Sequence, residues 1–192
     1  MIGVLVSGNG SNLQALIDAD LPIAAVASNR KDAYALVRAR AAAGIAVATF
    51  SLDCHADRKE RDLAMATWLE EHGVDLVVCA GYMHLLTKPF LDRFPGRIVN
   101  VHPSLLPAFP GARAIDDALE AGVETTGVTV HVVDDGVDTG EVIAQEEVPV
   151  EPRETLEARI HAVEHRLLPR VVASLAARIP CDKLSQARSG AR

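Results

Sequence analysis

Two polar residues are spaced so that they could stabilise a negative oxygen on an attacked carbonyl. Asn100 and His102 lie two positions apart after the apolar pair Ile98-Val99, and on a strand such residues point to the same face. Pro103 favours an extended backbone at His102 and helps to end the strand. An amide and an imidazole side by side can hold an oxyanion, which predicts acyl-type transfer without a nucleophilic Ser or Cys.

A glycine-containing segment, Ser7 to Leu13, follows the apolar run 2–6 and opens a helix. Its glycines let the backbone approach an anion, the helix N-terminus offers free N–H groups, and Ser11 and Asn12 are good capping residues. The dinucleotide fingerprint requires Gly or Ala where Leu13 stands, and both its acidic ribose ligand and a Walker-type Lys are missing. The segment therefore fits a single phosphate, with an ordinary Gly-rich turn as the alternative.

Apolar runs of strand length alternate with helical patterns over the first hundred residues. Strands are predicted at 2–6, 23–27, 45–49, 74–79 and 98–101, and helices at 13–18, 32–43 and 58–72, with Gly44 as a helix C-cap. Two strand-like runs at 126–133 and 141–150 then suggest an antiparallel hairpin, after a short helix at 116–121 that ends at Gly122. A long amphipathic helix at 155–177, with a kink near Pro169, follows.

This order predicts an α/β fold: an open, mostly parallel, doubly wound sheet with an antiparallel C-terminal addition and a long C-terminal helix. We expect one domain over residues 1–180 and a frayed tail over 181–192.

Composition limits the partners and the compartment. The 192 residues carry a net charge of −7, which argues against a nucleic-acid backbone as partner, and they contain no apolar run long enough to span a bilayer. Cys54, Cys79 and Cys181 are too far apart for a metal or redox motif and suggest a reducing compartment. We expect a cytoplasmic protein, monomeric or homodimeric, that acts on small molecules.

Four segments together closely resemble the phosphoribosylglycinamide formyltransferases, folate-dependent enzymes of purine synthesis. They are SGNGSNLQ (7–14), AGYM (80–83), NVHPSLLP (100–107) and DDGVDTG (134–140), and the resemblance covers residues 1–178. It implies a Rossmann-like formyltransferase fold and 10-formyltetrahydrofolate as co-substrate, with no metal.

The resemblance also implies roles for individual residues. The catalytic group would be Asn100, His102 and Asp138. Glycinamide ribonucleotide would be bound by Gly10, Ser11, Asn12, Leu13, Pro103 and Glu164. The folate cleft would be formed by Arg58, Met83, His84, Leu85, Leu86, Asn100, Asp134 and Asp138. The chain departs from the family at residues 112–115, where relatives often carry histidines, and at His84, where Arg is common.

The implied reaction is attack by the primary amine on the formyl carbon. Protonated His102 and the Asn100 amide would stabilise the alkoxide, and Asp138 would favour the imidazolium and relay a proton to the leaving nitrogen. Hydrolysis of formyl-folate would use the same residues, although such enzymes usually carry an extra N-terminal domain. A transferase acting on initiator tRNA would usually carry a further C-terminal domain. A non-catalytic nucleotide-sensing module is the third alternative.

Several of these residues also have structural interpretations. Arg58 could lie on a solvated helix face, the apolar residues after Tyr82 could be plain core, and the acidic loop could be a solvated turn or, less well, a calcium loop. Thr129 and His131 should share one strand face, from which Thr129 could orient the catalytic Asp or His. The pattern H-x-x-E-H at 161–165 matches inverted zinc peptidases, but it lacks an evident third ligand.

Overall fold

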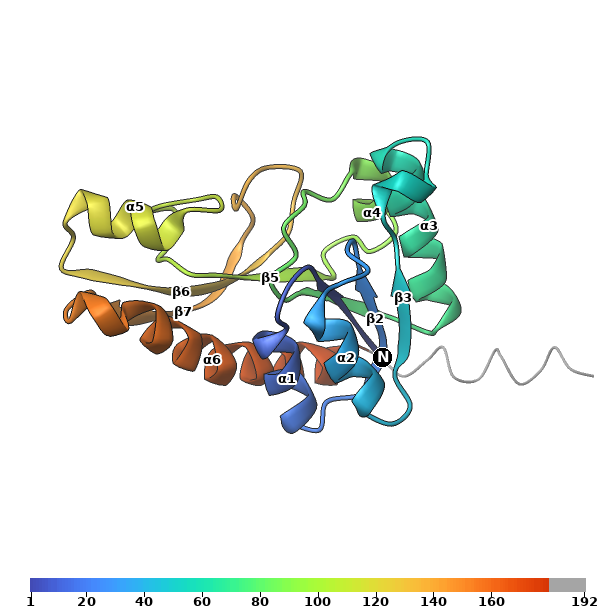
Figure 1. The fold of residues 1–192 in the computed structure, drawn as a ribbon, viewed down its shortest axis with the longest axis horizontal. Helices are drawn as coiled ribbons and strands as arrows, with labels where there is room; N and C mark the ends of the chain where they lie inside the picture. The colour runs from blue at the N-terminus through green and yellow to red at the C-terminus, as the bar shows by residue number, and fades with distance from the viewer. Residues whose placement is uncertain (180–192) are drawn as a thin grey trace, which may run out of the picture.

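The computed structural model describes residues 1–179, which form one mixed sheet with helices on both faces (Figure 1). Its strands are β1 (Ile2–Val6), β2 (Ile23–Ser28), β3 (Ala46–Thr49), β4 (Leu76–Cys79), β5 (Ile98–His102), β6 (Thr125–Val132) and β7 (Val142–Pro149). The spatial order is β3-β2-β1-β4-β5-β6-β7. The first five strands are parallel, and β6 and β7 are antiparallel to their neighbours. The expected fold class is therefore confirmed.

The helices divide between the two faces of the sheet. Helices α1 (Ser11–Asp18), α2 (Tyr34–Ala41) and α6 (Leu156–Arg178) contribute to one apolar cluster, and α3 (Arg58–Glu71) and α4 (Lys88–Leu91) to another. Helix α5 (Ala114–Ala121) lies at the end of the molecule beside β6 (Figure 1). Short 3-10 turns, η1 (Leu52–Cys54) and η2 (Arg153–Thr155), complete the elements.

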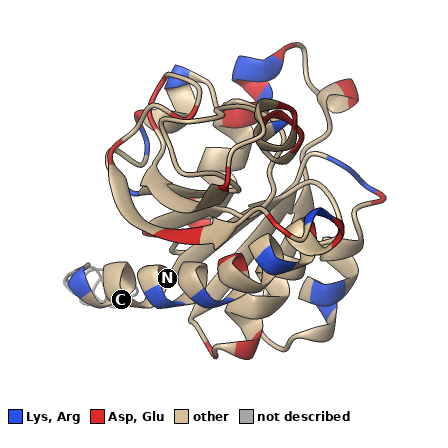
Figure 2. Cartoon of the chain, turned by 90° about the vertical axis from the view of Figure 1, so that its left-hand side faces the viewer, with Lys and Arg blue, Asp and Glu red and all other residues tan. Residues whose placement is uncertain are grey.

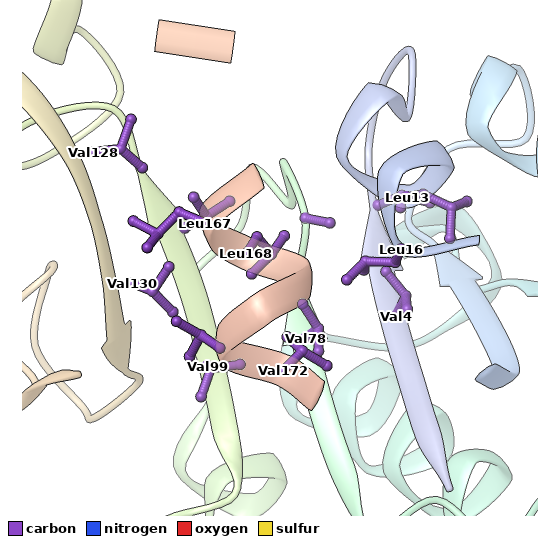
Figure 3. Packing of buried hydrophobic residues seen from close by; sticks show 14 of the residues in the cluster. Val4, Leu13, Leu16, Val78, Val99, Val128, Val130, Leu167, Leu168 and Val172 are labelled. Carbon is purple, nitrogen blue, oxygen red and sulfur yellow. The ribbon is translucent and has the colours of Figure 1, made fainter. Parts of the chain in front are cut away.

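Alternation along β5 and β6 separates an apolar face from a polar one. Val99, Val128 and Val130 are buried against Leu167 and Leu168 of α6 (Figure 3). The intervening residues of β5 and β6 point to the other side of the sheet. Packing of α6 on one face thus leaves the opposite face free for polar side chains.

Element boundaries match the predicted ones to within two residues, and β1 matches them fully; α4 and the two 3-10 turns were not predicted. Helix α5 ends at Gly122 as predicted, with a left-handed φ of 66°. Helix α2 ends before Ala42, so Gly44 (φ 80°) lies in the following turn and is not the C-cap. Pro169 lies inside α6. The expected tail and Cys181 lie outside the described residues.

Charged residues of both signs are distributed over the helices and loops. Figure 2 shows acidic and basic positions mixed on one side of the molecule. No helix of residues 1–179 is long and apolar enough to cross a membrane.

Candidate active site

A cleft of about 600 Å³ opens at the carboxyl ends of β1, β4 and β5. The chain connections reverse direction at β1, and this switch point is where ligands bind in open α/β sheets. The cleft is lined by residues 8–12, 79–86, 100–103, 111–112 and 133–138, together with His131, His161 and Glu164. The glycine-containing loop and the Asn–His pair therefore share one cavity.

The structure brings Asn100, His102 and Asp138 together in this cleft. Asn100 Nδ2 lies 3.5 Å from Asp138 Oδ1, and His102 Nδ1 lies 3.4 Å from Asp138 Oδ2. Asp138 arrives from the β6–β7 loop with a left-handed φ of 52°, and the Gly111 backbone N–H donates to its Oδ2 at 2.8 Å. An amide, an imidazole and a carboxylate thus converge; the strand pattern predicted the first two side by side, and the family resemblance added the third.

The surroundings of Asp138 hold its carboxyl group in the ionised form. The pKa of Asp138 falls from 3.8 to about 2, chiefly because the charged form of His131 donates to Oδ1. The Gly111 N–H and the positive charge of His102 lower the pKa further, whereas partial burial opposes the shift. At neutral pH the group is a fixed negative charge beside both imidazoles.

The lowered pKa of Asp138 predicts a pH-dependent stability difference between the wild type and Asp138→Asn. The folded-state pKa lies below the unfolded one, so the ionised group stabilises the fold above about pH 4, and this contribution disappears as the pH falls toward 2. We expect the gap in unfolding free energy between the two proteins to narrow by about 1–2 kcal/mol between pH 6 and pH 2. Urea unfolding at both pH values measures it, and a constant gap would contradict the shift.

His131 belongs to this group, although sequence reasoning noted only its strand face. It faces Asn100 across the β5–β6 ladder, and its Nδ1 donates to the Val132 carbonyl at 2.9 Å. Its Nε2 lies 3.2 Å from Asn100 Nδ2 and 3.5 Å from Asp138 Oδ1. When the His131 ring is neutral, its Nε2 accepts a hydrogen bond from the Asn100 amide. When the ring is charged, Nε2 donates to the Asp138 carboxylate. Sequence reasoning could have identified His131 by asking which residue of the neighbouring strand pairs with Asn100.

The Thr129 hydroxyl makes no hydrogen bond to Asp138 or His102 among the described residues, although the sequence suggested that it could orient one of them. Thr129 faces His102 across the ladder, but its hydroxyl donates to the Ser104 carbonyl at 2.6 Å. Thr129 therefore supports the loop that follows β5.

The glycine-containing loop leaves the first N–H groups of α1 without a side-chain cap. Gly10 occupies the N-cap with a left-handed φ of 79°, so neither Ser11 nor Asn12 caps the helix as expected. Arg38 of α2 holds the loop from behind, donating to the Asn9 carbonyl (3.0 Å) and to Asn9 Oδ1 (2.9 Å). Uncapped N–H groups at a helix start are suited to binding an anion.

Asn12 instead reaches across to α6. Its Nδ2 donates to Glu164 Oε2 at 3.0 Å, and both residues are buried at the cleft wall. Burial raises the pKa of Glu164, and the hydrogen bond from Asn12 opposes that shift. The Asn12 Oδ1 atom is buried without a hydrogen-bond partner among the described residues. The acceptor that this wall offers to the cleft is therefore the Glu164 carboxylate.

The residues expected at the opposite wall lie mostly where the sequence placed them. Met83, His84, Leu85 and Leu86 line the cleft, and Met83 and Leu85 are more than half exposed. Burial lowers the pKa of His84, and nearby arginine charges add to this shift. Arg58 does not line the cleft; its guanidinium donates to the Leu85 carbonyl at 2.6 Å and supports the wall from outside.

Leu13 differs from the other predicted substrate residues. Its side chain is fully buried in the core between β1 and the helices (Figure 3). Only its backbone could reach a ligand, because the first apolar position of α1 turns toward the sheet. Pro103 lines the cleft as expected.

A buried ion pair, which the sequence did not reveal, anchors the wall of residues 82–87. Arg61 and Asp62 are fully buried, with Arg61 Nη2 2.5 Å from Asp62 Oδ1. The second carboxylate oxygen accepts the Thr87 N–H at 2.8 Å. Arg61 and Asp62 lie in α3, within the helix predicted over residues 58–72.

Asp134 shapes its own loop, because its carboxylate accepts from the Gly136 N–H and the Thr139 hydroxyl. It lines the cleft beside Asp135. Among the lining residues of the described chain none is Lys or Arg. An anionic ligand would therefore depend on backbone N–H groups and imidazoles.

The two histidines of the H-x-x-E-H pattern do not converge on one site. Their rings stack with centroids 6.2 Å apart, but His161 lines the cleft and His165 lines a separate depression behind α1. Within residues 1–179, no group of three or more His, Cys, Asp or Glu side chains is arranged to hold a metal ion.

The fold and this cleft define an enzyme of the formyltransferase class. Residues 1–172 match the family described as formyl transferase, and the chain belongs to that family.

Relatives and solved structures agree with this assignment. A phosphoribosylglycinamide formyltransferase from Haemophilus influenzae is 44% identical over 89% of this chain and 84% of its own length. One from Mycobacterium tuberculosis is 46% identical over 90% and 83%. The crystal structure of the Streptococcus pneumoniae protein superposes with a TM-score of 0.86 at 46% identity, covering 91% of this chain and 97% of that one.

Proposed function

We propose that this protein transfers the formyl group of 10-formyltetrahydrofolate to the amine of glycinamide ribonucleotide, a step of purine biosynthesis. The names of the relatives support the formyl group and the phosphoribosylglycinamide acceptor, and the family resemblance supports the folate donor. The observation that carries the proposal is the convergence of Asn100, His102 and Asp138 in the cleft that also contains the phosphate-type loop. One substrate could then contact both the catalytic donors and the anion site, because they line the same cleft.

The ribonucleotide would occupy the end of the cleft formed by α1 and α6. Its phosphate would accept hydrogen bonds from the uncapped N–H groups of Gly10, Ser11 and Asn12. Its ribose hydroxyls would donate to the Glu164 carboxylate, which lines the cleft and is held by Asn12 Nδ2. This orientation directs the glycinamide amine toward Asp138.

The folate would enter along residues 83–86. The exposed apolar side chains of Met83 and Leu85 would cover the pterin ring. The loop from Asp134 to Asp138 would close the other side, with its backbone rather than the engaged Asp134 carboxylate. Arg58 lies outside the cleft on the Leu85 carbonyl, so it would meet the glutamate carboxylates only where they extend beyond this wall.

Transfer begins when the neutral amine attacks the formyl carbon, giving an ammonium and an alkoxide on one tetrahedral carbon. His102 Nδ1–H and an Asn100 N–H, both directed at Asp138 in the free site, would turn to the alkoxide. The Asn100–Asp138 contact is the longer of that amide's two contacts and is the one that an oxyanion would replace.

Asp138 would act on the proton that must leave the amine. Because its pKa is low, the Asp138 carboxylate would hold a proton only briefly. It would therefore stabilise the ammonium electrostatically and pass the proton to the folate nitrogen. The carbon–nitrogen bond to folate then breaks, the alkoxide becomes the amide carbonyl, and tetrahydrofolate leaves.

An absorbance assay for tetrahydrofolate formation tests the proposal directly. We expect turnover of 10-formyltetrahydrofolate only when glycinamide ribonucleotide is present, with one formylated product per tetrahydrofolate. Release of formate without the amine would instead establish a hydrolase, and no reaction with either mixture would favour a binding module.

A further inference from the structure

One loop contacts both members of the His102–Asp138 pair through its backbone. The Phe109 carbonyl accepts from His102 Nε2 at 2.8 Å, and the Gly111 N–H donates to Asp138 Oδ2 at 2.8 Å. Phe109 holds a left-handed φ of 54°, a conformation that non-glycine residues adopt only where surrounding contacts stabilise it. The loop between β5 and α5 therefore fixes the imidazole and the carboxylate relative to each other.

The Phe109 carbonyl also decides which ring nitrogen can act. A carbonyl can only accept, so His102 Nε2 must carry its hydrogen. The other nitrogen, Nδ1, faces Asp138 and is left to exchange a proton in the cleft. Without this carbonyl, the hydrogen of a neutral ring could reside on either nitrogen.

Side chains outside the cleft hold this loop in place. Ser104, fully buried, donates its hydroxyl to the Ala108 carbonyl at 2.6 Å and lies 3.3 Å from the Phe109 carbonyl. These contacts set the direction of the carbonyl that His102 requires.

Thr129 and Gln145 secure the base of the same loop. The fully buried Thr129 hydroxyl donates to the Ser104 carbonyl and accepts from the Leu106 N–H at 3.1 Å. Gln145, reaching in from the edge strand β7, donates to Thr129 Oγ1 at 2.9 Å and to the Leu106 carbonyl at 2.8 Å. The Thr129 hydroxyl thus uses its single donor and both acceptor positions.

We infer that Ser104, Thr129 and Gln145 are positioning residues for formyl transfer: they hold the loop that selects the His102 tautomer and orients Asp138. None of the three lines the cleft. The inference rests on the proposed function for its kinetic consequence, whereas the tautomer of His102 can be observed without any reaction.

The test compares Thr129→Val with Thr126→Val. Both remove a buried hydroxyl from β6, but the Thr126 hydroxyl has no hydrogen-bond partner among the described residues. We expect Thr129→Val to lower kcat by about 10- to 100-fold, with KM for both substrates within about twofold, because a small displacement of catalytic groups is costly. Thr126→Val should keep native kcat, and Thr129→Ser should restore most of the lost rate.

Nitrogen-15 chemical shifts of the histidine rings report the tautomer of His102. A general loss of stability would not change this tautomer. In the wild type we expect the Nε2-protonated or doubly protonated form of His102 throughout a pH titration, and in Thr129→Val a mixture of both neutral tautomers. If Thr129→Val folds poorly, kcat and the His102 spectrum are measured in Ser104→Ala and Gln145→Met instead.

Unchanged kcat and an unchanged His102 spectrum in the folded variants would overturn the inference. A change of tautomer in a protein whose wild type fails to transfer formyl would refute the proposed function and leave the positioning role standing.

Discussion

We expect that replacing Asp138 by Asn lowers kcat for formyl transfer by about two to three orders of magnitude. The substitution preserves the shape of the side chain and an acceptor for the Gly111 N–H. It removes the charge that faces His102 Nδ1 at 3.4 Å and the carrier for the amine proton. Steady-state kinetics with both substrates measures the effect, and KM for each should change by less than about tenfold.

Asp116→Asn is the matched control, because Asp116 lies exposed on α5, outside the cleft. Circular dichroism and thermal unfolding establish that both variants are folded at the assay pH. A folded Asp138→Asn protein that retains more than a tenth of wild-type kcat would show that the carboxylate is not part of the chemical step.

Gly10→Ala should be the most destabilising substitution in the phosphate-type loop. Alanine at φ 79° carries backbone strain, and its Cβ would lie 2.5 Å from Ala35 Cβ and 2.8 Å from Ala35 Cα, where backbone must shift. Strain and overpacking together should cost about 2–5 kcal/mol of unfolding free energy. Urea unfolding measures that loss, and KM for glycinamide ribonucleotide should rise because the α1 N–H groups are displaced.

Gly8→Ala in the same loop provides the comparison. A Cβ at Gly8 meets no atom within 4 Å, and its φ lies outside the left-handed range. Its unfolding free energy should stay within about 1 kcal/mol of the wild type. If both substitutions lowered the unfolding free energy by the same small amount, Ala35 would have moved aside without a loss of stability.

Substrate recognition in this cleft depends on few charged groups. With neither Lys nor Arg among the described lining residues, an anionic group bound inside the cleft would be held by backbone N–H groups and imidazoles, with charged side chains contributing from behind the wall. Arg38 and Arg58 both occupy such supporting positions, each donating to a backbone carbonyl of a cleft segment.

The sequence alone determined the features that arise from local periodicity. Alternation on β5 placed Asn100 and His102 on one face, because side chains of a strand repeat every two residues. Glycines predicted the loop before α1. Runs of apolar residues predicted the parallel strands and the hairpin of β6 and β7. The four motifs, matched to a family, then indicated the chemistry.

Only the tertiary structure decided what depends on contacts between distant segments. It showed that Asn12 donates to Glu164 of α6 instead of capping α1, that Leu13 faces the core, and that Arg61 and Asp62 are buried together. It also placed His131 between Asn100 and Asp138. Periodicity gives the direction of a side chain from its own element, but its partners are set by how the sheet, helices and loops pack.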